Sequence, residues 1–296
     1  MPELGCAFLT MNDPGDFVTD YELGIPRLQA LGWHVDLVPW RGSFVDWNAY
    51  DAVYICTPWD YLDDPELFLR VLAAIDASTA LLVNDIALVR WTLEKSYLAD
   101  LQVRGAAIVP SSWHKTISAR DIESFFARHN ADRVVIKPLI GANAADTFVL
   151  TQPVSDKQCR DIVAIYRDRP YLVQPFVAAI QTEGEYSLFY LGGEYSHAIQ
   201  KTPKAGDFRV QEEHGSEIVP VTPPGDLINI SSRVLALVEP SPVYARADFV
   251  RDDNDDFLLM ELELIEPSLY LRTDAGAPAR FAAAFDQHVR SRQATL

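Results

Sequence analysis

Apolar runs and helical patterns alternate along the first third of the chain. Strand, helix and strand at this spacing predict parallel βαβ units and a small three-layer α/β domain. Asn84 and Asp85 close a strand and are suited to cap a helix from Ile86 to about Val103, after which 106–110 returns to a strand. The other strands predicted here are 5–10, 34–39, 52–57 and 80–83, and the other helices are 20–31 and 65–75.

The order of predicted elements changes from Ser118 onward. A leading helix, two strands around a loop of small residues, a helix and a further strand form a compact α+β unit, which we interpret as an inserted lid. A strand meander, another helix, an acidic strand pair and a final helix complete the chain. The predicted division is a parallel α/β domain over 1–105, the lid over 106–177 and an antiparallel-sheet domain over 178–296.

The acidic strand pair, 243–250 and 257–266, carries charges on otherwise apolar strands. Because side chains alternate across a strand, Arg246 and Asp248 share one face, and Glu261 and Glu263 share another. Two such carboxylates need solvent or a cation to offset their repulsion. Oxygen ligands without nearby His or Cys favour Mg²⁺, which keeps waters and binds substrate phosphates. The alternative is a sheet with one solvated, charged face.

The composition is that of an ordinary folded protein, with 49% hydrophobic and 23% charged residues. The net charge of −17 repels nucleic acid and anionic membranes, so we expect neither as a partner. A nucleotide phosphate is compatible with this charge only where Lys and Arg converge with a metal. That local convergence is therefore the feature to find.

Sorting signals and disulfide patterns are not visible in the sequence. No apolar run approaches the roughly 18 residues of a membrane span, and the first residues lack a basic segment followed by a long apolar core. Cys6, Cys56 and Cys159 are odd in number and widely spaced, so we interpret them as reduced thiols. These observations predict a cytoplasmic protein.

Two segments are suited to bind a nucleotide. Lys137 ends a strand immediately before a loop of small residues, 139–146, whose backbone N–H groups can approach phosphate. The alternative is an exposed lysine before an ordinary hairpin. Further on, Gln174 and Pro175 interrupt an apolar strand, and because proline leaves a strand edge unpaired, that edge can hydrogen-bond adenine.

The order of these parts resembles the ATP-grasp superfamily, and within it the glutathione-synthetase-like branch. The resemblance covers nearly the whole chain. It rests on the α/β domain, the Asn-Asp helix with Lys95, Val-Ile-Lys-Pro, Val-Gln-Pro-Phe, Gly-Glu-Tyr-Ser, Asp-Phe-Arg and the paired acidic strands. It implies an ATP-grasp architecture and a site that binds ATP with Mg²⁺.

The resemblance also implies roles for individual residues. Lys95 and Lys137 would contact phosphates, and Asp248, Glu261 and Glu263 would hold Mg²⁺. Lys201, Arg209 and Arg246 would face the transferred phosphoryl group or the intermediate. The adenine and ribose would be bound by Gln174, Pro175, Phe176 and Val177, and by Glu183 or Glu185.

Two departures from the family pattern stand out. The metal strand of the family often ends Glu-x-Asn, and here Glu263 occupies the asparagine position, which adds negative charge. The phosphate loop over 141–146 also has fewer glycines than most members, which affects how readily it moves and closes.

The chemistry that the resemblance implies is attack of a substrate carboxylate on the γ-phosphate of ATP. This gives an acyl phosphate and ADP, and an amine then forms an amide or peptide bond. Such a transfer depends on positioning and charge neutralisation rather than on a nucleophilic side chain. The substrate is expected to be small and amino-acid-like. Its candidate contacts are Trp59, Asp60, Tyr61, Ser268 and Arg272, with an aromatic plug and a surface arginine as the alternatives.

Other functions remain open at this point. The Trp-Asp-Tyr segment and the Glu-Leu-Glu-Leu-Ile-Glu-Pro-Ser ending look like D-cycloserine synthetase, whose branch closes a ring within one substrate. A catalytically silent nucleotide-binding regulator is a further alternative. A ligase that modifies peptides is less favoured, and assembly into a homo-oligomer stays open.

Overall fold

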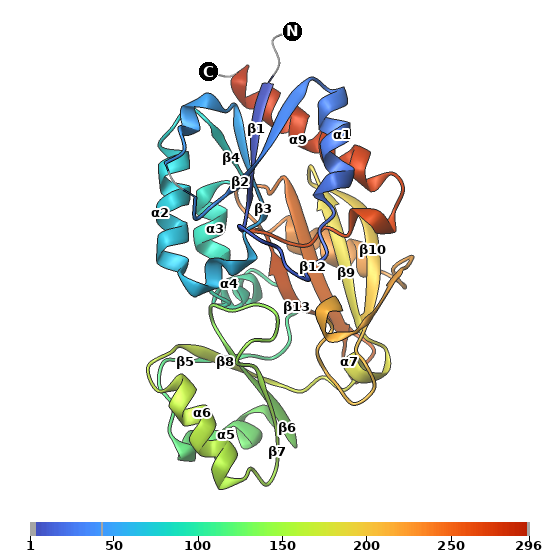
Figure 1. Ribbon diagram of the computed structural model, residues 1–296. Helices are drawn as coiled ribbons and strands as arrows, with labels where there is room; N and C mark the ends of the chain where they lie inside the picture. The colour runs from blue at the N-terminus through green and yellow to red at the C-terminus, as the bar shows by residue number, and fades with distance from the viewer. Residues whose placement is uncertain (1–3, 43, 295–296) are drawn as a thin grey trace.

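The computed structural model describes residues 4–42 and 44–294, which form three sheets with helices around them (Figure 1). The first sheet is parallel, with the strand order β2-β1-β3-β4. Parallel strands need crossover connections, and helices cover both faces of this sheet. Its strands are β1 (Leu4–Thr10), β2 (Trp33–Pro39), β3 (Ala52–Thr57) and β4 (Leu81–Val83), and its helices are α1 (Tyr21–Ala30), α2 (Pro65–Asp76), α3 (Ile86–Thr92) and α9 (Ala277–Gln293).

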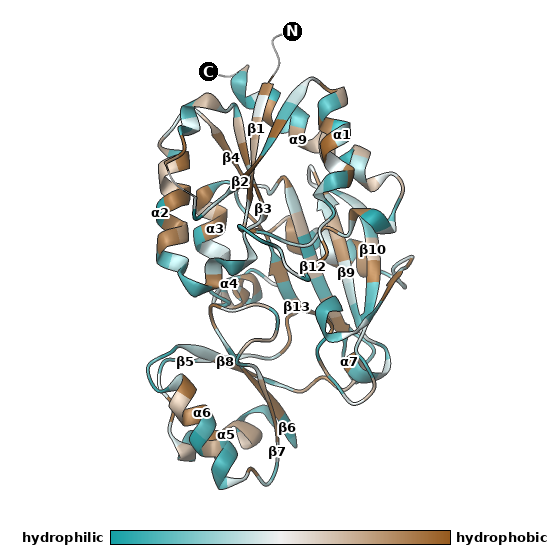
Figure 2. Cartoon of the chain, in the orientation of Figure 1, coloured by the Kyte–Doolittle hydropathy of each residue, from teal (hydrophilic) through white to brown (hydrophobic). Residues whose placement is uncertain are grey.

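Alternate residues of β1 pack into opposite helical layers. Phe8 lies in the hydrophobic cluster of Phe281 from α9, whereas Leu9 lies in that of Phe68 from α2. Figure 2 shows hydrophobic residues over most of α2, as a helix packed on a sheet requires. The predicted final helix is present as α9, and its Phe281, Phe285 and Val289 recur at helical spacing and are all buried. The first layer is therefore built from both ends of the chain.

The central sheet is antiparallel and has the strand order β11-β10-β9-β12-β13. In the β12/β13 pair, Arg246 lies opposite Glu263 and Asp248 lies opposite Glu261, followed by a bulge. The acidic strand pair predicted from the sequence is thus present in this sheet. The elements are β9 (Glu185–Leu191), β10 (Glu194–Thr202), β11 (Glu217–Pro220), β12 (Tyr244–Arg251) and β13 (Phe257–Glu263), and α4 (Tyr97–Val103) and α8 (Leu227–Leu235) contribute to their hydrophobic core.

The lid, at the lower end of the molecule in Figure 1, is a small sheet with the order β5-β8-β6-β7 and two helices. In β6, Val134 and Ile136 are fully buried in the lid core, whereas Val135 and Lys137 line the cavity described below. A capping box at Ser155 fixes the start of one lid helix. The elements are β5 (Ser112–His114), β6 (Arg133–Pro138), β7 (Phe148–Thr151), β8 (Tyr171–Pro175), α5 (Ala119–His129) and α6 (Asp156–Tyr166).

Two predictions around the junction of the first domain and the lid are wrong. The helix expected from Ile86 to Val103 is broken into α3 and α4, because the backbone N–H of Lys95 donates to Leu139 of the lid instead of continuing a helix. The strand expected over 106–110 is only an isolated bridge between Ile108 and Leu259. Pro110 has no N–H with which to extend a ladder, and the strand β5 begins beyond it.

In the ranges that the structure describes, no helix combines the length and apolar character needed to cross a bilayer.

Candidate active site

A cavity lies between the lid, the central sheet and the loops of the first domain. The lid contributes β6, β8 and the loop 141–146, and the central sheet contributes the charged faces of β9, β10, β12 and β13. Loop residues Phe17 and Val18 and the 3₁₀ turn η2 (Trp59–Asp63) close the end toward the first sheet. Most of the site residues predicted from sequence therefore meet in one place.

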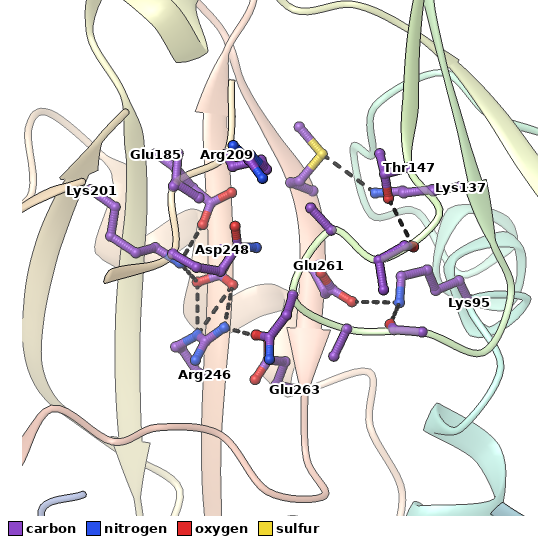
Figure 3. A pocket seen from close by; sticks show the side chains of 18 of the residues that line it. Lys95, Lys137, Thr147, Glu185, Lys201, Arg209, Arg246, Asp248, Glu261 and Glu263 are labelled. Carbon is purple, nitrogen blue, oxygen red and sulfur yellow. Dashed lines mark hydrogen bonds and ion pairs between the residues drawn. The ribbon is translucent and has the colours of Figure 1, made fainter. Parts of the chain in front are cut away.

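The central sheet holds a buried network of charges within this cavity (Figure 3). The Nζ atom of Lys201 lies 2.5 Å from Oε1 of Glu185 and 3.6 Å from Oδ1 of Asp248. Arg246 donates to Asp248 at 3.1 Å and to Glu263, and the hydroxyl of Ser187 donates to Asp248 at 2.5 Å. Alternation along the strands explains this arrangement, because these side chains all point to the cavity face of one sheet.

The carboxylates in this region have different pKa values for physical reasons. Burial works to raise the pKa of Asp248, but Arg246 and Lys201 lower it overall. Burial raises the pKa of Glu263 to about 7, since the single contact with Arg246 does not offset desolvation and the nearby Asp248 and Glu261. The cations thus favour the ionised form of Asp248, whereas the pKa of Glu263 lies above that of an ordinary carboxyl group.

The two lysines at the lid junction differ in their partners. Lys95 is buried, and its Nζ atom lies 2.9 Å from Oε1 of Glu261 and 2.6 Å from the carbonyl of Gly141. Lys137 lies within 3.8 Å of the Met260 sulfur and forms no ion pair with any residue of the described ranges. Burial lowers the pKa of Lys137, with Glu261 acting in the opposite direction. Figure 3 shows both ammonium groups directed toward the acidic strands.

The loop between β6 and β7 is held in an uncommon backbone conformation. Asn143, Ala144 and Asp146 have φ values of 52°, 55° and 53°, in the left-handed region that glycine normally occupies. Arg169 pairs with the Asp146 side chain, and the Tyr166 hydroxyl donates to its carbonyl. The loop that sequence showed to be poor in glycine is thus anchored to the lid at one end.

The predicted adenine segment lines the cavity from Gln174 to Val177. The expectation of an unpaired edge needs correction, because β8 lies between β5 and β6. However, β5 pairs with β8 only as far as Val173, so among the described residues the backbone of β8 beyond Val173 has no strand partner on the β5 side. Gln174 donates to Ser111 at 2.8 Å, and Arg133 lies 3.7 Å from the ring centroid of Phe176.

The two predicted ribose carboxylates are separated. Glu185 lines the cavity and is buried beside Lys201. Glu183 is not part of the lining and forms an ion pair with Arg251 at 3.0 Å. Glu183 precedes β9 at the end of the short helix α7 (Ala179–Thr182), and Gly184, with a φ of 99°, turns the chain between the two positions, so only Glu185 faces the cavity.

The predicted substrate residues are also divided. Trp59, Tyr61 and Ser268 line the cavity. Asp60 does not: it accepts from Trp40 at 2.5 Å and from Arg41 at 3.1 Å, which ties η2 to the end of β2.

Two predicted arginines are engaged by carboxylates of the chain itself. Arg272, in the 3₁₀ turn η4 (Leu271–Thr273), pairs with Asp20 and Glu212 rather than facing the cavity. Arg209 lines the cavity, and its guanidinium pairs with Asp207 at 2.7 Å. Arg209 therefore remains within the site, and Arg272 joins two loops at the cavity rim.

Glu266 is a cavity residue that the sequence reasoning passed over. Its carbonyl accepts from the Trp59 indole at 3.0 Å, and its carboxyl interacts with the Tyr61 hydroxyl. Burial and the charge of Glu263 raise the pKa of Glu266 to about 8. The signal in the sequence was an acidic residue directly before Pro267 in an apolar segment.

The carboxylate oxygens in the cavity fit Mg²⁺ only in part. Glu261 and Glu263 line the cavity, and each uses one carboxylate oxygen in an ion pair with a Lys or Arg of the chain. Mg²⁺ prefers oxygen ligands of this kind. Asp248 has both oxygens engaged by Arg246, Ser187 and Lys201. Within the described ranges no group of three His, Cys, Asp or Glu side chains is already arranged around one point. Glu261 and Glu263 would therefore hold Mg²⁺ together with phosphate and water, and the role of Asp248 stays a prediction.

The fold and this cavity define a class of proteins. Residues 104–236 match the family described as prokaryotic glutathione synthetase, ATP-grasp domain, and residues 6–84 match the D-cycloserine synthetase DcsG, N-terminal domain. The chain therefore has the ATP-grasp fold and contains a glutathione-synthetase-like ATP-grasp domain, and it is similar to ATP-grasp ligases along most of its length.

Particular relatives narrow this class. The chain is 27% identical over 291 residues to the cycloserine biosynthesis protein DcsG of Streptomyces lavendulae, covering 92% of this chain and 95% of the relative. The crystal structure of D-cycloserine synthetase DcsG superposes with a TM-score of 0.85 at 25% identity, over 96% and 99% of the two chains. D-alanyl-alanine synthetase A from Vibrio cholerae, with a TM-score of 0.69 and 13% identity over the full length of both chains, shares the fold. The predicted ATP-grasp architecture is confirmed.

Proposed function

We propose that this protein activates the carboxylate of a small amino-acid-like substrate with ATP and joins it to a nitrogen nucleophile. The observation that carries the proposal is Lys137, a partly buried cation in the cavity without a carboxylate partner among the described residues. It lies across from Glu261, whose charge opposes the lowering of its pKa by burial, and Lys95 and the loop 141–146 contribute to the same cavity. An unpaired ammonium in a cavity is a binding site for an anion such as phosphate.

The residues of the chain then have distinct roles. Lys95, Lys137 and the backbone of the loop 141–146 bind the phosphates, and the segment 174–177 binds the base. Bound Mg²⁺ between Glu261 and Glu263 supplies charge neutralisation for phosphoryl transfer. Arg246 and Arg209 stabilise negative charge on the transferred group and on the acyl centre.

The two steps balance without a nucleophilic side chain. A substrate carboxylate oxygen attacks the γ-phosphorus, and the bond to ADP breaks with its electron pair on ADP. A nitrogen of the nucleophile then attacks the acyl carbon, phosphate leaves with its electron pair, and the nitrogen loses a proton. The lid covers the cavity, which protects the acyl phosphate from water.

Ring closure within one substrate is the second candidate. It is supported by the match of the first domain to that of D-cycloserine synthetase, because the first domain supplies Trp59 and Tyr61 to the cavity. Under this proposal the carboxylate and the nitrogen belong to the same amino-acid derivative.

ADP release from Mg-ATP tests the proposal. Purified protein is mixed with pools of amino acids, amino-acid derivatives carrying a second nitrogen, hydroxy acids and dipeptides, and each pool is compared with protein alone. We expect at least one pool to stimulate ADP release and Glu261→Gln to abolish the stimulation. The mass of the product distinguishes the two reactions, because ring closure uses one substrate molecule and ligation joins two, whether or not these are the same compound. No stimulation by any pool, with ATP bound normally, contradicts the proposed reaction.

We place this activity in the cytoplasm, where ATP is abundant. The three cysteines support this location, because Cys6 and Cys56 are buried thiols and Cys159 is also free.

A further inference from the structure

Glu266 differs from the other acidic residues that line the cavity. Five other acidic residues of the lining have buried or partly buried side chains, and each forms an ion pair with a Lys or Arg. These residues are Glu185, Glu212, Asp248, Glu261 and Glu263. Glu213 is exposed at the rim. Glu266 is partly buried, and within the described ranges it forms no ion pair. The cavity therefore contains one sheltered carboxyl group without a cationic partner.

The surroundings of Glu266 hold its carboxyl group in place. The Trp59 indole donates to its backbone carbonyl at 3.0 Å, and the Tyr61 hydroxyl, on a side chain only 5% exposed, interacts with its carboxyl group. Phe17 packs against Trp59 with a ring-centroid distance of 5.2 Å. Because no hydrogen bond or ion pair from any described residue other than Tyr61 occupies the oxygens of this carboxyl group, they retain acceptor capacity for a ligand.

The position of Glu266 relates it to the reacting centre. It follows the metal strand β13, and both Glu263 and Arg246 are near enough to influence its charge. Arg246 is the cation that we assign to the acyl centre. A substrate whose carboxylate lies near Arg246 would thus place a neighbouring amino group toward Glu266.

We propose that Glu266, positioned by Tyr61, binds the ammonium group of the substrate and thereby selects amino acids over hydroxy acids. This inference rests on the proposed function, because it names the residue that binds the ammonium group of the same substrate. Burial alone favours the neutral acid, since the pKa is raised to about 8, and a bound ammonium supplies the missing counter-charge. Binding an ammonium near pH 7 then releases a proton from Glu266.

The experiment is calorimetric binding to the full-length protein with Mg²⁺ and a non-hydrolysable ATP analogue. The probes are D- and L-alanine, D- and L-serine and D-cycloserine, each amino acid being compared with its hydroxy-acid counterpart, lactate or glycerate. We expect an amino acid to bind wild-type protein more tightly than its hydroxy acid. Glu266→Gln should lose about tenfold to a hundredfold in amino-acid affinity and none in nucleotide affinity.

Two controls separate this role from a structural one. Glu213→Gln makes the same change at the exposed rim and should leave amino-acid affinity unchanged. Proton release on binding, measured in buffers of different ionisation enthalpy, should be present in wild type and lost in Glu266→Gln. Tyr61→Phe, which removes only the hydroxyl, should weaken amino-acid binding less than Glu266→Gln does.

The outcomes distinguish this inference from the proposed function. Normal nucleotide binding with amino acids bound equally by wild type and Glu266→Gln overturns the role of Glu266. So does normal nucleotide binding with no amino acid bound, or with hydroxy acids bound as tightly as amino acids. Failure of wild-type protein to bind the Mg-nucleotide instead overturns the proposed function.

Discussion

The cations of the central sheet and Lys137 of the lid differ in whether carboxylates of the chain pair with them. Lys201 and Arg246 each contact two carboxylates within the sheet, and both are buried. Lys137 in the lid is only partly buried and has the Met260 sulfur as its polar neighbour. Both cations of the sheet are thus compensated by carboxylates of the same sheet, whereas Lys137 of the lid forms no ion pair with any residue that the structure describes.

This difference indicates how the two regions contribute. A buried ion pair is costly to break, because removing one partner leaves the other charged group without compensation. An unpaired lysine instead reduces stability until an anion binds. The sheet is therefore preorganised before ligands arrive, and the lid lysine is completed by the ligand.

The largest effect is expected from Arg246→Met. Removing this guanidinium leaves Asp248 and Glu263 buried with fewer partners, so the free energy of unfolding should fall by about 3–5 kcal/mol. Urea unfolding checks this value. Arg280→Met, which removes an exposed pair with Asp274 at 2.6 Å, is the control and should change stability by less than about 1 kcal/mol. An equal loss of unfolding free energy in the two variants would show that the buried network of the sheet contributes no more than an exposed ion pair.

A smaller effect concerns pH. The pKa of folded Glu266 is about 8, above its unfolded value of about 4.3, so the folded state retains a proton that the unfolded state releases between these values. Stability of the ligand-free protein therefore falls as pH rises through this window. Glu266→Gln should reduce that fall by on the order of 1–3 kcal/mol, allowing for partial exposure. Identical pH profiles of wild type and variant from pH 5 to 8.5 would contradict the assigned pKa.

The smallest effect is expected from Trp59→Phe. This change removes the hydrogen bond to the Glu266 carbonyl, which is worth about 1 kcal/mol, and keeps an aromatic ring beside Phe17. The Michaelis constant for the substrate should rise by about fivefold while that for ATP stays constant. A fall in melting temperature with both Michaelis constants unchanged would support an aromatic plug instead.

Much of the architecture was predictable, because strand and helix periodicities are local. The βαβ order, the lid elements and the acidic strand pair follow from alternation and turn residues along the chain. The break of the predicted helix at Lys95 was not predictable, because it depends on a hydrogen bond to Leu139 in another domain. Tertiary contacts of this kind leave no periodic signal.

The site was predictable where side chains share a strand and less so in loops. Alternation predicts that Arg246 and Asp248 share a face and that Glu261 and Glu263 share a face, and the register of the strands places these two pairs opposite each other. The pairing of Asp60 with Arg41, and of Arg272 with Asp20, joins segments whose proximity the sequence does not show. Glu266 was overlooked for the same reason, because its partner Tyr61 comes from the first domain.

The measurement that tests the central claim most directly is calorimetric binding of Mg-ADP to wild type and Lys137→Met, together with urea unfolding of both. The account predicts that affinity falls about tenfold to a hundredfold in Lys137→Met, while the ligand-free protein is as stable as wild type or more stable. Lys157→Met, which removes an exposed lid lysine paired with Asp161, should alter neither quantity. Unchanged Mg-ADP affinity in Lys137→Met would contradict the claim that this lysine awaits the phosphates.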